Sequence, residues 1–141
     1  MKVEDILMVK GPDVIVAPPD TTVADAARMM NQADVGSVII KDGDQVKGIF
    51  TERDLLKRVV AKGLDPHSVR LAEVMSSPIK SCRLEDAVHD CGLRLTREKF
   101  RHLAVMEDEA LIGVIGLRDV MSAQIREAEN RIRELESHGT D

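Results

Sequence analysis

Aromatic side chains are almost missing from this chain of 141 residues, which has no Trp, no Tyr and only two Phe. Proteins that bind single-stranded nucleic acid usually stack bases on aromatic rings. Both candidates for that role, Phe50 and Phe100, stand in apolar surroundings. The formal net charge of −5 also lacks the basic excess that a duplex-binding face requires. We therefore expect no nucleic-acid partner.

Long apolar runs are also missing, since no stretch approaches the roughly 20 apolar residues that cross a bilayer. The first residues carry acids early and have no apolar core of a signal peptide. These absences predict no membrane partner and a cytoplasmic location. Cysteine is scarce as well, and Cys82 and Cys91 are expected to be reduced apolar fillers. A metal site that adds His89 is the alternative, but the spacing fits no common zinc pattern.

The sequence does contain an internal repeat, because four segments recur in the same order in the second half. The Gly and the Arg-Asp pair of the longest segment are kept in both copies, and apolar residues replace apolar residues between them. The pairs are VKGIFTERDLL at 46–56 with LIGVIGLRDVM at 111–121, SVIIK at 37–41 with HLAVM at 102–106, VADAA at 23–27 with LEDAV at 84–88, and VEDIL at 3–7 with LAEVM at 71–75.

Hydrophobic spacing predicts the same elements in each half. The first half has a helical stripe from Val23 to Met30, which Asp20, Thr21 or Thr22 can cap. Two strands, 37–41 and 46–50, surround an Asp42-Gly43 turn, and a second stripe comprises Leu55, Leu56, Val59 and Val60. The second half repeats this with a stripe at Leu84, Ala87, Val88, Cys91 and Leu95, strands 102–106 and 111–115 around a turn at 107–109, and a helix from Leu117.

This order predicts an α/β protein made of two βαββα repeats packed with pseudo-twofold symmetry, plus a C-terminal helix. A short opening segment precedes each repeat. We expect one domain over residues 1–66, a second over 67–122, and a C-terminal amphipathic helix and tail over 123–141. Neither repeat is long enough to bury a comfortable core alone.

The repeated junction between strand and helix has two interpretations. In the structural one, Thr51 is an N-cap and Asp54 completes a capping box. In the functional one, the helix start and Arg53 attract phosphate while Asp54 accepts hydrogen bonds from ribose hydroxyls. The second copy keeps the Arg-Asp pair as Arg118 and Asp119 but has Gly116 in place of Thr51. Loss of the hydroxyl weakens the structural interpretation for that copy.

These residues resemble the cystathionine-β-synthase (CBS) domain family. The stretch GIFTERD at 48–54 looks like the signature of that family, as does RHLAV at 101–105 before the second hairpin. Two such domains form a Bateman module, and the likeness covers residues 1–122, closest to small stand-alone CBS-pair proteins.

The resemblance implies a regulatory module without catalysis, which binds AMP, ADP, ATP, NADH or S-adenosylmethionine in the cleft between two CBS domains and signals to an unidentified partner. No further cofactor is required. The family pattern assigns ribose contacts to Asp54 and Asp119, a ribose or phosphate contact to Thr51, and phosphate contacts to Arg101 and His102. Gly116 departs from the pattern. Adenine would lie near the first strand of each domain, at Val16 and Ala17 and at Lys80 and Ser81.

The C-terminal segment carries apolar residues at heptad spacing, namely Met121, Ile125, Ala128, Ile132 and Leu135. Arg131 and Glu136 could pair between two parallel copies of this helix. Because CBS pairs often form dimers, the resemblance implies a homodimer, and we expect this helix to reinforce it. The alternative is a helix packed on its own domain. A structural homodimerisation module with vestigial ligand clefts is the alternative function. No nucleophile and base are spaced as an enzyme needs them.

Overall fold

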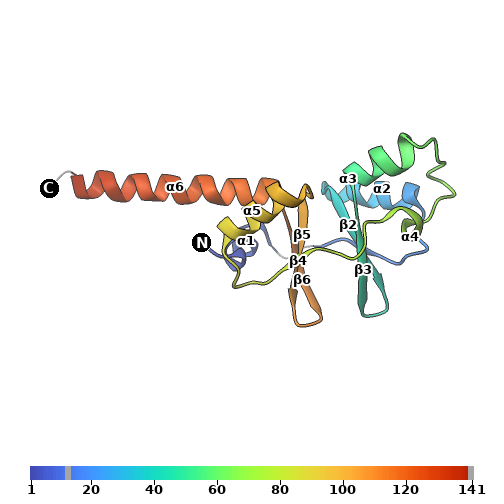
Figure 1. Cartoon of the computed structure of the whole chain (residues 1–141), viewed down its shortest axis with the longest axis horizontal. Helices are drawn as coiled ribbons and strands as arrows, with labels where there is room; N and C mark the ends of the chain where they lie inside the picture. Colours follow the sequence, from blue (N-terminus) through green and yellow to red (C-terminus); the bar gives the residue numbers. More distant parts are fainter. Residues whose placement is uncertain (12–13, 140–141) are drawn as a thin grey trace. The chain divides into compact units, whose positions relative to one another are not determined.

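The computed structural model describes residues 1–11 and 14–139, and the chain divides into two compact units. Unit 1 comprises Met1–Pro12 and Lys80–Asp141, and unit 2 comprises Asp13–Ile79. Figure 1 shows the elements of both, and each unit is described by itself below. The predicted boundaries at 66 and 122 divide the sequence repeat differently and stay a prediction.

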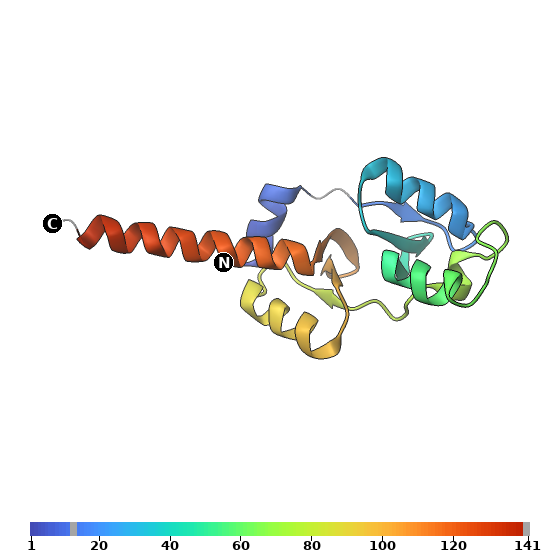
Figure 2. The ribbon, with the colours of Figure 1, turned by 90° about the horizontal axis from the view of Figure 1, so that it is seen from above.

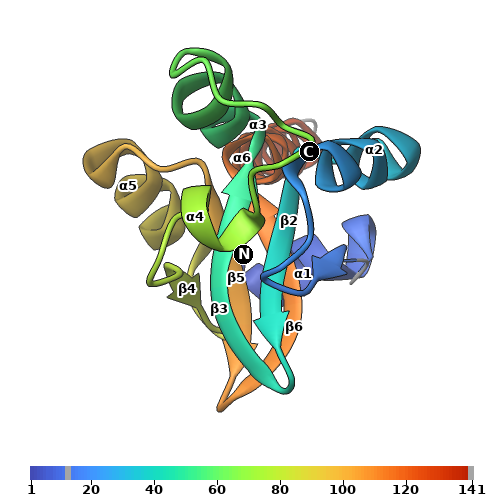
Figure 3. The same cartoon turned by 90° about the vertical axis from the view of Figure 1, so that its right-hand side faces the viewer.

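Unit 2 has a three-stranded sheet in the order β1-β2-β3. Its helices are α2, α3 with the π-helical η1 that continues it, and α4. The elements are β1 (Val16–Ala17), α2 (Val23–Ala33), β2 (Ser37–Asp42), β3 (Gln45–Thr51), α3 (Glu52–Asp54), η1 (Leu55–Val60) and α4 (Leu71–Val74). β1 pairs with β2 in parallel, and β2 with β3 antiparallel, as the hairpin in Figure 3 shows.

Unit 1 repeats this topology with the order β4-β5-β6, again one parallel and one antiparallel pair. Its elements are α1 (Val3–Lys10), β4 (Ser81–Cys82), α5 (Val88–Glu98), β5 (His102–Glu107), β6 (Ala110–Gly116) and α6 (Leu117–Gly139). The predicted α/β class and C-terminal helix are confirmed. Both hairpins also shift register at the same place of the repeat, between Ile40 and Lys41 and between Val105 and Met106.

The opening segments do not pack on the repeat that follows them in the sequence. Helix α1 belongs to unit 1, where the Lys2 backbone pairs with Ala87 and where Val3, Ile6 and Leu7 join the core. The second opening segment, α4, belongs to unit 2, where Leu71 and Val74 are buried. Each spatial unit is therefore completed by the opening segment of the other sequence half.

Element ends depart from the prediction at two places, while the cap of α2 is one of the three residues predicted for it. Thr22 caps α2, since its hydroxyl accepts from the Asp25 backbone N–H at 3.2 Å. Helix α5 begins at Val88 rather than Leu84, because Asp86 closes a turn by accepting from the Arg83 backbone N–H at 2.9 Å. The first hairpin turn comprises Gly43 and Asp44, one residue later than predicted.

The stripe predicted over residues 55–60 is only half buried. Val59 is buried and Leu55 is partly buried, but Leu56 and Val60 are exposed. The segment is a π-helix in which Leu55 and Val59, four residues apart, face the core, while their neighbours Leu56 and Val60 face outward.

Two aliphatic cores hold the units. Phe50 is the largest fully buried side chain of unit 2, while Phe100 packs against the core of unit 1. Complete burial of an aliphatic or Phe side chain contributes about 1.5–3 kcal/mol. Both Phe residues thus serve packing rather than base stacking, as their apolar surroundings indicated.

The two cysteines lie in the unit 1 core with free thiols. A hydrogen bond to Cys91, together with burial, raises the pKa of Cys82, and the same hydrogen bond lowers the pKa of Cys91. Among the residues that the structure describes, no helix is long and apolar enough to span a membrane.

Gly48 in β3 permits a close backbone approach. A Cβ at this position would lie 2.6 Å from the Ser76 carbonyl oxygen and 3.0 Å from the Met75 sulfur. The approach exists because Ser76 pairs with Ile49 on the outer edge of β3, with backbone N···O distances of 2.8 and 3.0 Å. At Gly113, its counterpart in the repeat, the three atoms nearest to an added Cβ belong to the Leu7 side chain, the first at 3.1 Å.

We expect Gly48→Ala to destabilise the protein by about 1–3 kcal/mol, because the added methyl group displaces backbone rather than a flexible side chain. Gly113→Ala is the matched control and should cost less, since Leu7 can shift. Urea unfolding followed by circular dichroism measures both. Equal midpoints for Gly48→Ala and the unchanged protein would contradict this view of the β3 edge.

Candidate functional site

Asp54 lies in the first turn after β3 and forms the predicted capping box with Thr51. Its Oδ2 accepts from the Thr51 backbone N–H at 3.0 Å and from the Thr51 hydroxyl at 3.2 Å. The Asp54 backbone N–H donates to the Thr51 hydroxyl oxygen at 3.3 Å. The box is therefore confirmed, and it fixes the carboxylate at the start of the helix.

The second oxygen of Asp54 has two partners that were not among the predicted site residues. The Ser76 hydroxyl donates to Oδ1 at 3.2 Å, and Arg58 Nε lies 3.5 Å from the same oxygen. Arg58 also donates to the Met75 carbonyl at 3.0 Å. Only Arg58 had a sequence signal, because it follows Asp54 by four helical residues. The Asp54 side chain is 10% exposed.

Asp119 occupies the equivalent place in unit 1, at the start of α6, but has a different partner. Its Oδ2 accepts from the Gly116 backbone N–H at 2.8 Å, so half of the box survives without a hydroxyl. The same oxygen forms a 2.8 Å ion pair with Lys10 Nζ. Lys10 also donates to the Val114 carbonyl at 2.7 Å.

Lys10 and Ser76 play corresponding roles. Ser76 donates its backbone N–H to the Ile49 carbonyl and its hydroxyl to Asp54. Val114 and Asp119 are the repeat counterparts of Ile49 and Asp54, and Lys10 contacts both with one ammonium group. Asp119 is therefore bound by Lys10 at the end of the opening helix α1, and Asp54 by Ser76, which follows the opening helix α4. No pattern in the sequence pointed to Lys10.

The two carboxylates differ in how much bonding capacity remains. Both oxygens of Asp54 have partners within unit 2. Both described bonds of Asp119 reach Oδ2, and its side chain is 26% exposed. Because a carboxylate accepts about four hydrogen bonds, Asp119 retains more capacity for a ligand than Asp54.

Three other predicted residues of unit 1, Arg101, His102 and Arg118, lie at the start of α6. The Arg101 carbonyl accepts from the Leu117 backbone N–H at 2.8 Å, and His102 pairs with Gly116 across the hairpin. Arg118 is exposed on the first turn. Lys80 and Ser81 run along the other side of β5, where Ser81 pairs with Ala104.

In unit 2, the predicted residues are less tightly grouped. Val16 and Ala17 form β1, beside Ile39 and Ile40 of the central strand, and Val16 is partly accessible while Ala17 is buried. Arg53 is exposed, and it is Arg58 rather than Arg53 that approaches Asp54.

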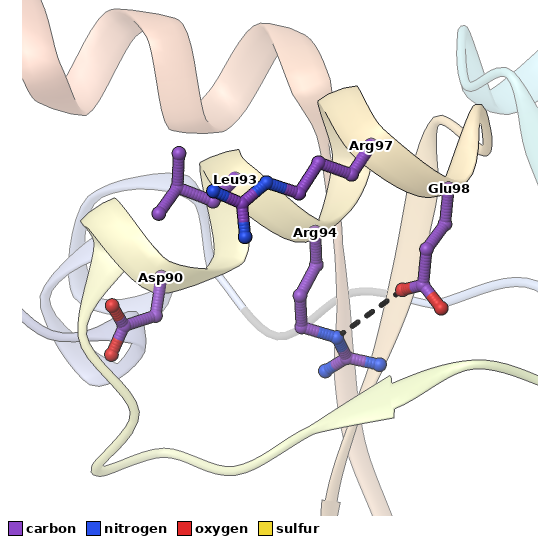
Figure 4. Close-up of a pocket in the computed structure, with 5 residues that line it drawn as sticks. All are labelled: Asp90, Leu93, Arg94, Arg97 and Glu98. Carbon is purple, nitrogen blue, oxygen red and sulfur yellow. Dashed lines mark ion pairs between the residues drawn. The ribbon is translucent and has the colours of Figure 1, made fainter.

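The pocket drawn in Figure 4 lies elsewhere, on the outer side of α5. It measures about 370 Å³ and is lined by Asp90, Leu93, Arg94, Arg97 and Glu98. In this pocket, Arg94 Nε lies 3.7 Å from Glu98 Oε2. All five residues come from one helix, and none belongs to the aspartate junctions, so we give this hollow no role. In the described part of the chain, no three His, Cys, Asp or Glu side chains are grouped as a metal site requires.

Comparisons with known proteins give the family. The CBS domain model matches residues 3–61 and 71–126. A CBS-domain-containing protein from Agrobacterium tumefaciens is 33% identical, with a TM-score of 0.82 over 88% of this chain and 99% of that one. A CBS domain protein from Pyrobaculum aerophilum, complexed with AMP, is 25% identical, with a TM-score of 0.73 over 84% of this chain and 89% of that one.

A curated relative from Arabidopsis thaliana is the mitochondrial CBS domain-containing protein CBSX3. It is 31% identical over 124 residues, which are 84% of this chain but only 60% of that protein. The chain thus spans less than two thirds of this relative. The two matched segments, the repeated topology and the likeness to solved CBS structures lead to one conclusion: this chain belongs to the CBS domain family and contains two CBS domains.

Proposed function

We propose that this chain is a non-catalytic regulatory module that binds an adenosine-containing ligand and signals its presence to a partner protein. The observation that carries the proposal is the repeated aspartate at a helix start, oriented by a backbone N–H three residues earlier. Such a carboxylate suits the two adjacent hydroxyls of a ribose. The AMP complex of the Pyrobaculum aerophilum protein supports this ligand class.

Each predicted residue except Gly116 keeps a role in this proposal. Asp54 and Asp119 would accept from ribose hydroxyls, with Thr51 beside the first. The phosphates would meet the helix starts, the basic residues Arg53, Arg101 and Arg118, and His102. Adenine would lie against the strand backbone at the pairs Val16-Ala17 and Lys80-Ser81, since aromatic rings are scarce.

Among the proposed ligands, phosphate-bearing nucleotides fit unit 1 best. Lys10 carries three N–H donors and uses two of them on Val114 and Asp119, so the third is available to an anion. Arg101 and Arg118 flank the same helix start. This concentration of positive charge favours AMP, ADP or ATP over the cationic S-adenosylmethionine.

We further propose that the protein forms a homodimer and acts in the cytoplasm, a reducing compartment that suits its two free thiols. The alternative function is a structural homodimerisation module whose ligand sites are vestigial. Gly116, which supplies no hydroxyl, and the exposed apolar residues of α6 favour it. Ligand binding discriminates the two functions, because a vestigial site binds no nucleotide at millimolar concentration.

The first test compares Asp54→Asn with Asp119→Asn in calorimetric titrations with AMP, ADP, ATP, NADH and S-adenosylmethionine. Each hydrogen bond to a charged group contributes about 1.5–3 kcal/mol, so loss of a ribose contact should weaken binding at least about 10-fold. We expect the larger loss for Asp119→Asn, because Asp54 is already committed to internal partners.

Asp108→Asn is the matched control for this test. It makes the same change on an exposed turn of unit 1, where Asn tolerates the left-handed backbone. Circular dichroism verifies that each variant is folded. Unchanged affinity in both Asp54→Asn and Asp119→Asn would refute the site, and no binding by the unaltered protein would refute the proposed function.

The second test concerns Lys10 and compares AMP with adenosine, which lacks the phosphate. The unaltered protein should prefer AMP. Lys10→Met should reduce that preference about 10-fold by removing the ammonium group, whereas Lys10→Arg should largely keep it. Lys62→Met, on an exposed turn of unit 2, is the control. An unchanged preference in Lys10→Met, with AMP still bound, would remove Lys10 from the site without refuting nucleotide binding.

A further inference from the structure

Helix α6 continues well beyond the part of it that packs in unit 1. Its first turns are anchored by Val120 and Ala123, which are buried beside the unit 1 core. From Ala128 to His138 every side chain is exposed. Figure 2 shows this distal part extending away from α1 and α5. The predicted alternative, a helix packed on its own domain, therefore describes only the first turns of α6.

The exposed part carries an apolar stripe that starts within the anchored turns. The side chains of Met121, Ile125, Ile132 and Leu135 are 53, 57, 55 and 67% exposed, and Ala128 lies between them. We call these five residues the α6 seam. At 100° per residue, the seam is centred roughly 130° around the helix from Val120 and Ala123. It is thus a second face, separate from the one that anchors the helix.

The residues of the α6 seam fit a two-stranded coiled coil. Ile125 and Ile132 stand at a positions, while Met121, Ala128 and Leu135 stand at d. Ile at a with Leu at d favours two strands over three or four. Isolated helices of this length are marginal in water, so burial of the seam by a partner would stabilise the distal turns.

Charges beside the α6 seam favour a parallel over an antiparallel partner helix. In a parallel, in-register pair, Arg131 at g faces Glu136 at e of the other helix, and Gln124 faces Glu129 in the same way. An antiparallel pair in which position 128 faces position 132 brings e against e and g against g, so Glu129 would face Glu129, and Arg131 would face Arg131, of the other helix. Like charges so placed oppose association, whereas the parallel pair gains two Arg–Glu contacts by symmetry.

We propose that α6 pairs with the same helix of a second copy of this chain, as a parallel, in-register coiled coil over residues 121–135. The inference rests on the homodimer proposed above, to which it adds the surface and the orientation. It does not depend on nucleotide binding. The occupant is a second copy because the charges on the helix complement themselves only in this arrangement.

Disulfide cross-linking of the full-length chain tests the proposal. Position 128 is a d layer, where a parallel pair brings the two copies of one residue within disulfide distance. Ala128→Cys should therefore form a covalent dimer under mild oxidation, as seen on a non-reducing gel. Asn130→Cys, at the outward f position of the same exposed segment, is the matched control and should stay monomeric on the gel. The native thiols are buried in both.

Charge reversal gives an independent readout by light scattering. Arg131→Glu should weaken the dimer, because in both symmetric contacts the new carboxylate at position 131 would face Glu136 of the other helix. Arg131→Glu combined with Glu136→Arg should restore the dimer.

Equal cross-linking of Ala128→Cys and Asn130→Cys would overturn the proposal, as would a dimer in solution with no cross-link at position 128. A cross-link that requires both Ala128→Cys and Ile132→Cys would overturn the parallel orientation, because 128 faces 132 in the antiparallel pair. A monomer in light scattering would refute the homodimer itself.

Discussion

The aspartate at each helix start needs several donors, and the local structure of both units is arranged to supply them. A carboxylate removed from water costs free energy unless it is hydrogen-bonded. Asp54, with little exposure, has donors from Thr51, Ser76 and Arg58. Ser76 reaches it only because its segment pairs with the edge of β3, and that pairing requires the missing side chain of Gly48. One glycine thus links strand packing to the electrostatics of the carboxylate.

Unit 1 meets the same requirement with different chemistry. The ammonium group of Lys10 replaces the backbone N–H and hydroxyl of Ser76, and Gly116 replaces Thr51. A positive charge in place of a neutral hydroxyl makes the surroundings of Asp119 more favourable to anions, and fewer internal bonds leave the carboxylate more accessible. Sequence divergence between the two repeats therefore divides their proposed roles, with Asp54 the more structural and Asp119 the more available to a ligand.

Helix α6 connects the two proposals of this protein. Asp119 lies in its first turn, and the α6 seam runs along its exposed part. The face that anchors it in unit 1 and the face of the seam are distinct, so the helix can remain packed while a second copy covers the seam. The proposed ligand site and the proposed dimer surface are thus built on one continuous secondary-structure element.

The amino-acid sequence by itself determined the repeat, the order of the elements, the capping box at Thr51 and Asp54, and the heptad spacing of the tail. These features depend on residues close together in the chain, where periodicity and capping rules apply. Periodicity failed at Leu84, which precedes α5, and at Leu56 and Val60, which lie on the exposed side of η1.

Only the tertiary structure decided which opening segment completes which unit, and with it the partners of the two aspartates. Lys10 precedes Asp119 by more than a hundred residues, and Ser76 follows Asp54 by 22. No local pattern encodes such pairs, because they arise from the way α1 and the segment after α4 pack beside β6 and β3. The exposure of the α6 seam was decided in the same way, since heptad spacing alone is equally compatible with a helix packed on its own domain.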